Sequence, residues 1–233
     1  VDSVFTDTAY VARSLGGILA NAESQGLALP RRLYATVVYG RPESVLFVDS
    51  VMLVALNHYL GADYPGYSHW PVYMRLGKTP QALPYDLAEA LVATSYPYSL
   101  EGGDATALSR MIYEGVLTHA KMSLVPDGSL GDALGYTDAQ MRWLEENEGS
   151  IWRSIIHRQL LYDTSESTAD RLVAPSPEVS VVEPGAPGRV GRYIGYRIVS
   201  AYLADHPDAT LPQMLSPEFY KGNSVLINSQ YQH

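Results

Sequence analysis

Apolar residues recur at helical spacing over the first part of the chain. Val11, Leu15 and Ile18 fall on one face when the sequence is wound as a helix, so the pattern predicts an opening helix over residues 4–22. Pro30 ends the segment that follows this helix, because proline cannot continue a helical hydrogen-bond pattern.

Two runs rich in β-branched and aromatic residues come next, at residues 33–39 and 44–54. Such runs favour strands, and the Gly-Arg-Pro turn sequence at 40–42 separates them. A tight turn at residues 49–50 would divide the second run. We therefore expect two or three strands that form a small sheet over about residues 32–55, which carries the strongest strand signal in the chain.

After the predicted sheet the pattern becomes mostly helical. A proline on each side bounds a helix over residues 81–94. Asp104 is placed to act as the N-cap of a second helix, which runs to about Leu124. Both helices carry apolar residues three and four positions apart, which predicts one buried face for each.

Thr137 and Gln140 have the spacing of a capping box, in which two side chains satisfy the first backbone donors of a helix. The helix that they open runs to about Tyr162 and is the longest in the predicted set. Residues 174–188 contain four prolines and predict an extended connection. A further helix follows over residues 189–204.

These elements predict an α+β fold, with a small N-terminal sheet followed by a helix-dominated body. The residues after the proline-rich connection are too few for a core of their own. We therefore expect one domain over residues 1–233, with the sheet at about 32–55, the helical body at 56–206 and a C-terminal extension at 207–233.

Composition excludes several classes of function. The 233 residues include 16 Lys and Arg against 25 Asp and Glu, which gives a formal net charge of −9. Nucleic-acid-binding surfaces need clustered basic residues, so we expect no nucleic-acid partner. The sequence contains no cysteine, which removes disulfides, thiolate zinc sites and cysteine nucleophiles. No apolar run reaches the ~18 residues that a membrane-spanning helix needs.

Two of the predicted helices carry a polar residue on an apolar face. An ionised carboxylate in a core is costly unless it is paired, so we expect Glu148 to be buried with a hydrogen-bonding partner. His119 is either a hydrogen-bonded histidine at the rim of the core or a metal ligand or acid–base group. The apolar stripe around Glu148 consists of Met141, Leu144, Ile151, Trp152 and Ile155.

No histidine pair has the spacing of a standard zinc-peptidase site. That site places two histidines four residues apart on one helix, and no two of the six histidines have this separation. A Gly-x-Ser-x-Gly nucleophile elbow is also absent from the sequence. We therefore expect no catalytic residues, no metal and no cofactor.

Three glycines, Gly188, Gly191 and Gly195, lie three and four residues apart. Each glycine in a helix costs about 1 kcal/mol relative to alanine, so their common face predicts the close approach of another backbone. Arg189, Arg192 and Arg197 lie nearby in the sequence and can pair with Glu148 or with other carboxylates.

Aromatic residues are crowded into residues 59–73. A tyrosine joins a flat apolar ring to a hydrogen-bonding tip, a combination that is common at surfaces that bind partners or glycans. Half-buried anchoring of a loop explains the same composition equally well. The candidate binding residues in this segment are Tyr59, Tyr64, Tyr67 and Trp70.

Six segments resemble those of one family and occur in the same order. They are residues 57–67 (NHYLGADYPGY), 111–115 (MIYEG), 135–137 (GYT), 143–152 (WLEENEGSIW), 160–162 (LLY) and 187–199 (PGRVGRYIGYRIV). Together these segments are similar to the GldB family, the gliding-motility-associated lipoproteins of Bacteroidetes. The resemblance spans about residues 30 to 230.

The family in turn resembles, more distantly, zinc peptidases of the gluzincin type, which implies a degenerate peptidase-like fold. The resemblance places Tyr113 and Leu117 at the positions of the two zinc-binding histidines. It places Glu114 at the position of the general base, and Glu148, in preference to the alternative Glu146, near that of the third ligand. Tyr113, Glu114, His119 and Glu148 are thus candidate relics of a metal site.

The resemblance implies a non-catalytic lipoprotein of the cell envelope, periplasmic or at the outer-membrane surface, that acts through contacts with other envelope proteins. Gliding or secretion machinery is the candidate partner, and the lipid anchor is expected on a cysteine upstream of Val1. One alternative is an atypical metallohydrolase or peptidase. Another is a glycan- or peptide-binding module that uses the tyrosine-rich residues 59–73.

Overall fold

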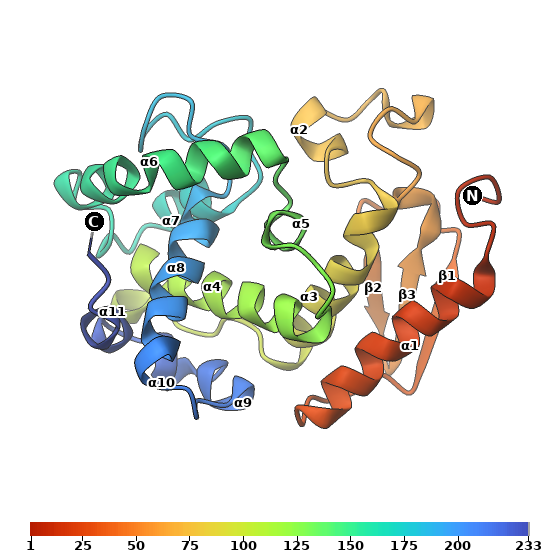
Figure 1. Ribbon diagram of the computed structural model, residues 1–233, viewed down its shortest axis with the longest axis horizontal. Coiled ribbons are helices and arrows are strands. Elements are labelled where there is room, and N and C mark those ends of the chain that lie inside the picture. Colours follow the sequence, from red (N-terminus) through yellow and green to blue (C-terminus); the bar gives the residue numbers. More distant parts are fainter. Residues whose placement is uncertain (233) are drawn as a thin grey trace. The chain divides into compact units, whose positions relative to one another are not determined.

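Three strands and eleven α-helices make up most of the regular structure in the computed structural model, which describes residues 1–232 (Figure 1). The strands are β1 (Arg32–Thr36), β2 (Val45–Val48) and β3 (Val51–Ala55). The helices are α1 (Thr8–Ser24), α2 (Val72–Arg75), α3 (Leu83–Ser95), α4 (Ala107–Leu124), α5 (Leu130–Leu134), α6 (Asp138–His157), α7 (Glu166–Val173), α8 (Val190–Asp205), α9 (Leu211–Met214), α10 (Pro217–Tyr220) and α11 (Ser224–Ser229). This confirms the α+β class with a helix-dominated body. Similarity to a zinc peptidase stays a prediction.

The chain forms two compact units. Unit 1 contains Val1–Pro97 and Ala120–Gly135. Unit 2 contains Tyr98–His119 and the residues from Tyr136 onward. The organisation of the whole chain as one domain stays a prediction. None of the helices in the described part of the chain is long and apolar enough to cross a membrane.

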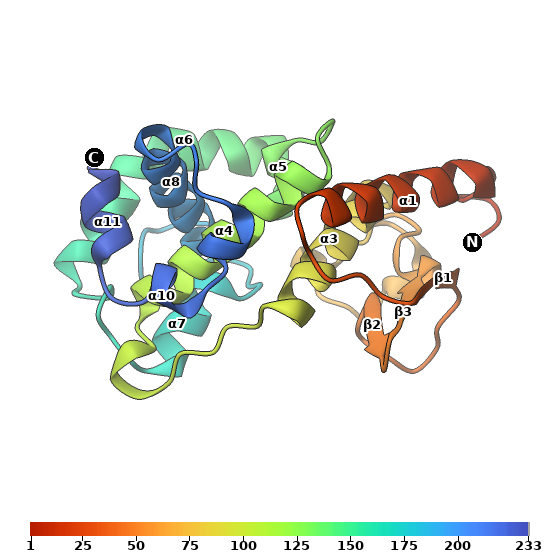
Figure 2. The same cartoon turned by 90° about the horizontal axis from the view of Figure 1, so that it is seen from below.

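The sheet of unit 1 has the strand order β1-β3-β2, with β3 parallel to β1 and antiparallel to β2. The predicted tight turn between β2 and β3 is confirmed, and Asp49 adopts a left-handed φ of 55° there. Met52 and Val54 of β3 are fully buried. Helices α1 and α3 lie on one side of this sheet (Figures 1 and 2), and the alternation along β3 shows that one face of the sheet is covered.

Two helix ends differ from their predicted positions. Helix α4 is capped by Thr106, whose hydroxyl accepts a hydrogen bond from the Ser109 backbone N–H at 3.1 Å, whereas Asp104 lies in a separate 3-10 turn. Helix α6 begins at the predicted capping box of Thr137. It ends at His157 instead of near Tyr162, because Gln159 adopts a φ of 56° that a right-handed helix cannot contain.

Helix α8 runs across α4 and packs against α6 within unit 2 (Figure 1). The predicted close approach of a backbone is confirmed at Gly195, because a Cβ atom there would collide with the backbone carbonyl of Met111. The C-terminal residues 207–233, expected to be an extension, contain α9, α10 and α11. Helix α11 packs against α8, so the C-terminal residues 207–231 are an integral part of unit 2.

Candidate functional site

Glu114 is the first of the candidate relic residues, and it lies on α4 with 2% of its surface exposed. The Arg110 guanidinium, one turn earlier on the same helix, lies 3.0 Å from its Oε1 atom. Arg192 Nε of α8 lies 3.2 Å from its Oε2 atom and donates a hydrogen bond to the Val173 carbonyl at 2.9 Å. Two guanidinium groups therefore neutralise one buried carboxylate.

Glu148, on α6, is also buried, with 5% of its surface exposed, which confirms the prediction from its apolar stripe. The Tyr193 hydroxyl donates to its Oε2 atom at 2.7 Å, and the Tyr231 hydroxyl donates to its Oε1 atom at 2.8 Å. Arg197 Nε lies 3.0 Å from Oε1. The Glu148 carboxylate is thus held by two phenols and one guanidinium, which is the hydrogen-bonded burial that a polar group requires.

The two phenols that hold Glu148 keep their protons over an extended pH range. Burial is the first cause that raises the pKa of Tyr193 above its usual value, and the hydrogen bond to Glu148 is the second. The pKa of Tyr231 is raised in the same way and in the same order of causes. A protonated phenol remains a donor, so both hydrogen bonds persist at neutral and at moderately alkaline pH.

His119 is half-buried near the end of the part of α4 that belongs to unit 2, and its side chain contacts α8. Its Nε2 atom lies 3.0 Å from Ser200 Oγ, and its ring stacks on Tyr196 with the centroids 4.4 Å apart. Burial lowers the pKa of His119 to about 4. The imidazole is therefore neutral at pH 7 and is engaged by groups of α8.

Tyr113 stands at one of the two positions where the family resemblance would place a zinc-binding histidine, and Leu117 stands at the other. Both side chains are 3% exposed. The Tyr113 ring packs edge-on against the rings of Tyr98 and Tyr220, at centroid distances of 5.5 and 5.4 Å. These two positions of α4 are therefore part of the packed core of unit 2.

The four candidate residues form separate contacts in unit 2 instead of converging on one point. Helix α8 supplies a partner to three of them: Arg192 to Glu114, Arg197 to Glu148 and Ser200 to His119. Within residues 1–232 no group of three or more His, Asp or Glu side chains is arranged to hold a metal ion. The three contacts made by Arg192, Arg197 and Ser200 instead join α4 and α6 to α8.

Sequence reasoning missed several members of these clusters. Arg110 could have been found, because it precedes Glu114 by four residues and such pairs are neighbours on a helix. Tyr231 could not have been found, because it lies 83 residues from Glu148 and follows no periodic pattern. The pairing of an arginine of 189–197 with Glu148 was predicted, and Arg197 confirms it.

The tyrosine-rich segment belongs to unit 1, and two of its four candidate binding residues are buried. Tyr59 is fully buried and donates a hydrogen bond to Asp86 Oδ2 at 2.8 Å. Tyr67 is 4% exposed and donates to the Asn57 carbonyl at 2.7 Å. These two rings anchor the segment from inside, so a ligand in solution does not reach them.

The other two candidates, Tyr64 and Trp70, line a hollow of about 590 Å³ in unit 1. Tyr64 is 42% exposed and Trp70 is half-buried. The loop after β1 provides the opposite wall of this hollow, which we call the loop hollow. Tyr39, Arg41, His58 and His69 also line the loop hollow.

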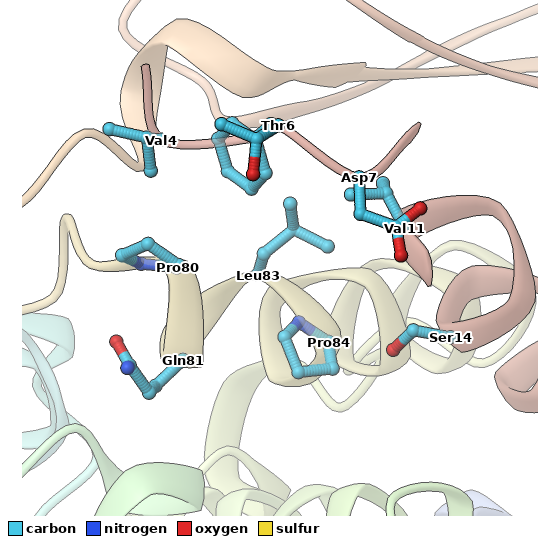
Figure 3. Close-up of a pocket in the computed structure, with 10 residues that line it drawn as sticks. Val4, Thr6, Asp7, Val11, Ser14, Pro80, Gln81, Leu83 and Pro84 are labelled. Atoms are coloured by element: carbon cyan, nitrogen blue, oxygen red, sulfur yellow. The ribbon is translucent and has the colours of Figure 1, made fainter. Parts of the chain in front are cut away.

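A second hollow of unit 1, of about 320 Å³, lies between the segment before α1 and the start of α3 (Figure 3). Val4, Val11 and Leu83 make part of its wall apolar. Asp7, which also lies 3.7 Å from Arg13, is the acidic residue among those that line it. None of the candidate site residues predicted from the sequence takes part in this hollow.

Comparison with models of known protein families identifies the family to which the chain belongs. The family model described as gliding motility protein GldB matches residues 3–233, which is nearly the entire sequence. The chain belongs to the GldB family. A search of curated proteins and a search of solved structures each give no significant match.

Membership of the GldB family makes this chain one of the gliding-motility lipoproteins, which implies an association with the cell envelope. It also suggests a role other than catalysis, and partners among envelope proteins. The six segments that carry the resemblance contribute to both units. Residues 57–67 supply Tyr59 and Tyr67 to the core of unit 1, while residues 143–152 and 187–199 supply Glu148 and its partners on α8.

Proposed function

We propose that this GldB-family chain is a non-catalytic, lipid-anchored envelope protein that acts by binding other envelope proteins. The observation that carries the non-catalytic part is the state of Glu114 and Glu148. Each carboxylate is buried and is already held by arginine, and Tyr113 and Leu117 pack where a zinc site would need histidines. A zinc ion would have to displace these partners from the carboxylates before it could bind.

The outer face of the sheet in unit 1 supports the binding part of the proposal. The strand register places Tyr34, Leu53 and Leu46 side by side on the face opposite to Met52 and Val54. Val48 shares this outer face and is 53% exposed, and Tyr34 is 46% exposed. A contiguous apolar patch on a soluble domain is typical of a protein-binding surface.

The edges of the sheet add to this argument. Strands β1 and β2 each pair only with β3 in the described part of the chain. Each edge strand therefore presents backbone groups that a partner's strand can pair with. An apolar face bordered by open strand edges suits a protein partner better than a small molecule.

Metal analysis tests the non-catalytic part. The full chain, purified without chelator and then dialysed against zinc and buffer, is expected to retain no stoichiometric zinc and to cleave no peptide substrate. The variant Glu148→Gln serves as a comparison, since a bound metal would be lost from it. Stoichiometric zinc that depends on Glu148, with Zn–O distances of about 2.0–2.2 Å, would overturn the proposal in favour of an atypical metallohydrolase.

Site-directed crosslinking tests the binding part. The printed sequence has no cysteine, so Tyr34→Cys gives a single reactive position on the outer sheet face. In the envelope of a gliding host this position is expected to crosslink to one defined protein, and Val48→Lys in the same chain is expected to abolish that product. Ile227→Cys, which is 63% exposed in unit 2, is the control. Equal crosslinking from both positions would contradict binding through the sheet.

A further inference from the structure

The loop hollow of unit 1 has walls that are fixed by hydrogen bonds. The Asn57 side chain donates to the Val38 carbonyl and accepts from the Val38 backbone N–H, both at 2.9 Å. These two bonds tie the loop after β1 to the turn after β3. The Tyr67 hydroxyl in turn accepts from the Leu60 backbone N–H at 3.1 Å, which fixes the opposite wall. A hollow with fixed walls loses little conformational entropy when a ligand binds.

Aromatic rings border the loop hollow on both sides. Tyr39 on the loop is 85% exposed, and Tyr64 on the opposite wall is 42% exposed. The Trp70 ring also lines the hollow, and its centroid lies 5.6 Å from that of His58 and 5.3 Å from that of His69. Exposed rings around a hollow of about 590 Å³ provide flat apolar area for a ligand of a few rings, since ordinary ligand pockets measure roughly 300–1,000 Å³.

The charge of the loop hollow is opposite to that of the chain. Arg41 is the charged side chain among the described residues that line it, and no Asp or Glu is among them. The chain as a whole carries −9. Lys78 adds a second cation beside the hollow, with its Nζ atom 5.1 Å from the centroid of the Trp70 ring. These two cations favour an anionic group at the hollow, and the charge of Glu43, which acts on His58, opposes them in part.

His58 supplies an unsatisfied hydrogen-bonding group at the hollow. Its ring lines the hollow with 5% of the residue exposed, and its Nδ1 atom is buried without a hydrogen-bond partner. Burial, followed by the charge of Lys78, lowers the pKa of His58. A neutral imidazole has one donor and one acceptor nitrogen, and a hydroxyl group can serve either of them.

We propose that the loop hollow binds an acidic oligosaccharide, with sugar rings against Tyr39, Tyr64 and Trp70 and a carboxylate against Arg41. A sugar combines apolar C–H faces with hydroxyls that both donate and accept, whereas each peptide group offers one fixed donor and one fixed acceptor. The residues of this site are different from those of the outer sheet face, and its test does not depend on the protein partner.

Tryptophan fluorescence and calorimetry with tetragalacturonic acid provide the test. Trp70 is the tryptophan of unit 1, because Trp143 and Trp152 both belong to unit 2. The full chain is expected to bind this probe with a saturable change in fluorescence that Trp70→Phe removes. Affinity is expected to fall as NaCl is raised from 50 to 500 mM, since exposed ion pairs are screened by salt.

Two variants with matched controls locate the binding. Arg41→Gln is expected to weaken binding by about tenfold, the size of effect that loss of one charge-assisted hydrogen bond produces. Arg31→Gln, at an exposed arginine of unit 1 that does not line the hollow, is expected to leave binding unchanged. Tyr64→Ala is expected to weaken binding similarly, while Tyr162→Ala, at a tyrosine 57% exposed in unit 2, leaves it unchanged. All four positions are at least partly exposed, so the variants are expected to fold, and circular dichroism verifies this.

Three results would overturn the proposal. Absence of saturable binding up to 10 mM probe would remove the site. Equal affinity for cellotetraose, a neutral oligosaccharide, would remove the role of Arg41 and its carboxylate partner. Tighter binding of a tetraglutamate peptide than of tetragalacturonic acid would replace the sugar by an acidic peptide.

Discussion

The hydroxyl of Tyr231 donates a hydrogen bond to Oε1 of Glu148 at 2.8 Å, joining two residues that are 83 positions apart. The Tyr231 ring also packs edge-on against Trp152, with the centroids 5.1 Å apart. The end of the described chain therefore completes the set of donors around a buried carboxylate of α6. Because this contact involves a charge, it is expected to stabilise unit 2 more than an ordinary hydrogen bond does.

Tyr231→Phe removes the hydroxyl and keeps the ring against Trp152. The Glu148 carboxylate then loses one charged hydrogen bond in a site that water does not easily reach. The free energy of unfolding is expected to fall by about 1.5–3 kcal/mol in urea denaturation. Tyr162→Phe removes the same hydroxyl from a tyrosine that is 57% exposed. This control is expected to change the free energy of unfolding by less than about 0.5 kcal/mol. Equal effects of the two variants would mean that the Tyr231 contact contributes nothing.

Glu148→Ala removes the acceptor that two phenols and Arg197 share. The buried Tyr193 and Tyr231 hydroxyls are then left without their partner, and a small cavity forms. We expect a loss of about 3 kcal/mol in the free energy of unfolding, near the upper end for a broken buried network. Glu145→Ala, at an exposed position one turn earlier on α6, is the control and is expected to be nearly neutral. Similar unfolding curves for the two variants would contradict a structural role of Glu148.

His119 makes the stability of unit 2 dependent on pH. Burial lowers its pKa from 6.5 to about 4 in the folded protein, so the unfolded chain binds more protons between these two values. Stability therefore falls as the pH decreases from about 6.5 toward 4, by up to about 3 kcal/mol from this one residue. The measurement is urea denaturation at several pH values for the wild type and for His119→Asn, because carboxylates titrate alike in both. Parallel curves would show that His119 does not titrate in this way.

The sequence predicted the features that depend on near neighbours. The capping box at Thr137 and the turn at residues 49–50 are confirmed because both depend on side chains within three residues. The burial of Glu148 is confirmed because its apolar neighbours on α6 recur every three or four residues. The predicted start of α4 was wrong because Asp104 and Thr106 are both favourable N-cap residues, and the local sequence does not distinguish between them.

Features that depend on distant contacts could not be predicted. Helices α9, α10 and α11 have four to six residues, too few for a helical period to be recognised in the sequence. Helices this short depend on tertiary packing, and α11 packs against α8. Tyr59 and Tyr64 have the same side chain, yet one bonds to Asp86 in the core and the other lines a hollow. Composition indicates that a tyrosine needs a polar contact but not whether protein or ligand provides it.

Gly195→Ala tests the close approach of α8 to α4. A Cβ atom at this position would collide with the Met111 carbonyl and come within 3.3 Å of the Gly115 backbone nitrogen, and backbone atoms cannot rotate away as a side chain can. The helix-propensity gain of about 1 kcal/mol for alanine is therefore outweighed, and we expect a net loss of about 1–3 kcal/mol in the free energy of unfolding. Gly16→Ala in α1, where a Cβ atom would meet nothing within 4 Å, is expected to show only the gain. Stabilisation by both variants would mean that α8 lies farther from α4 than the structure shows.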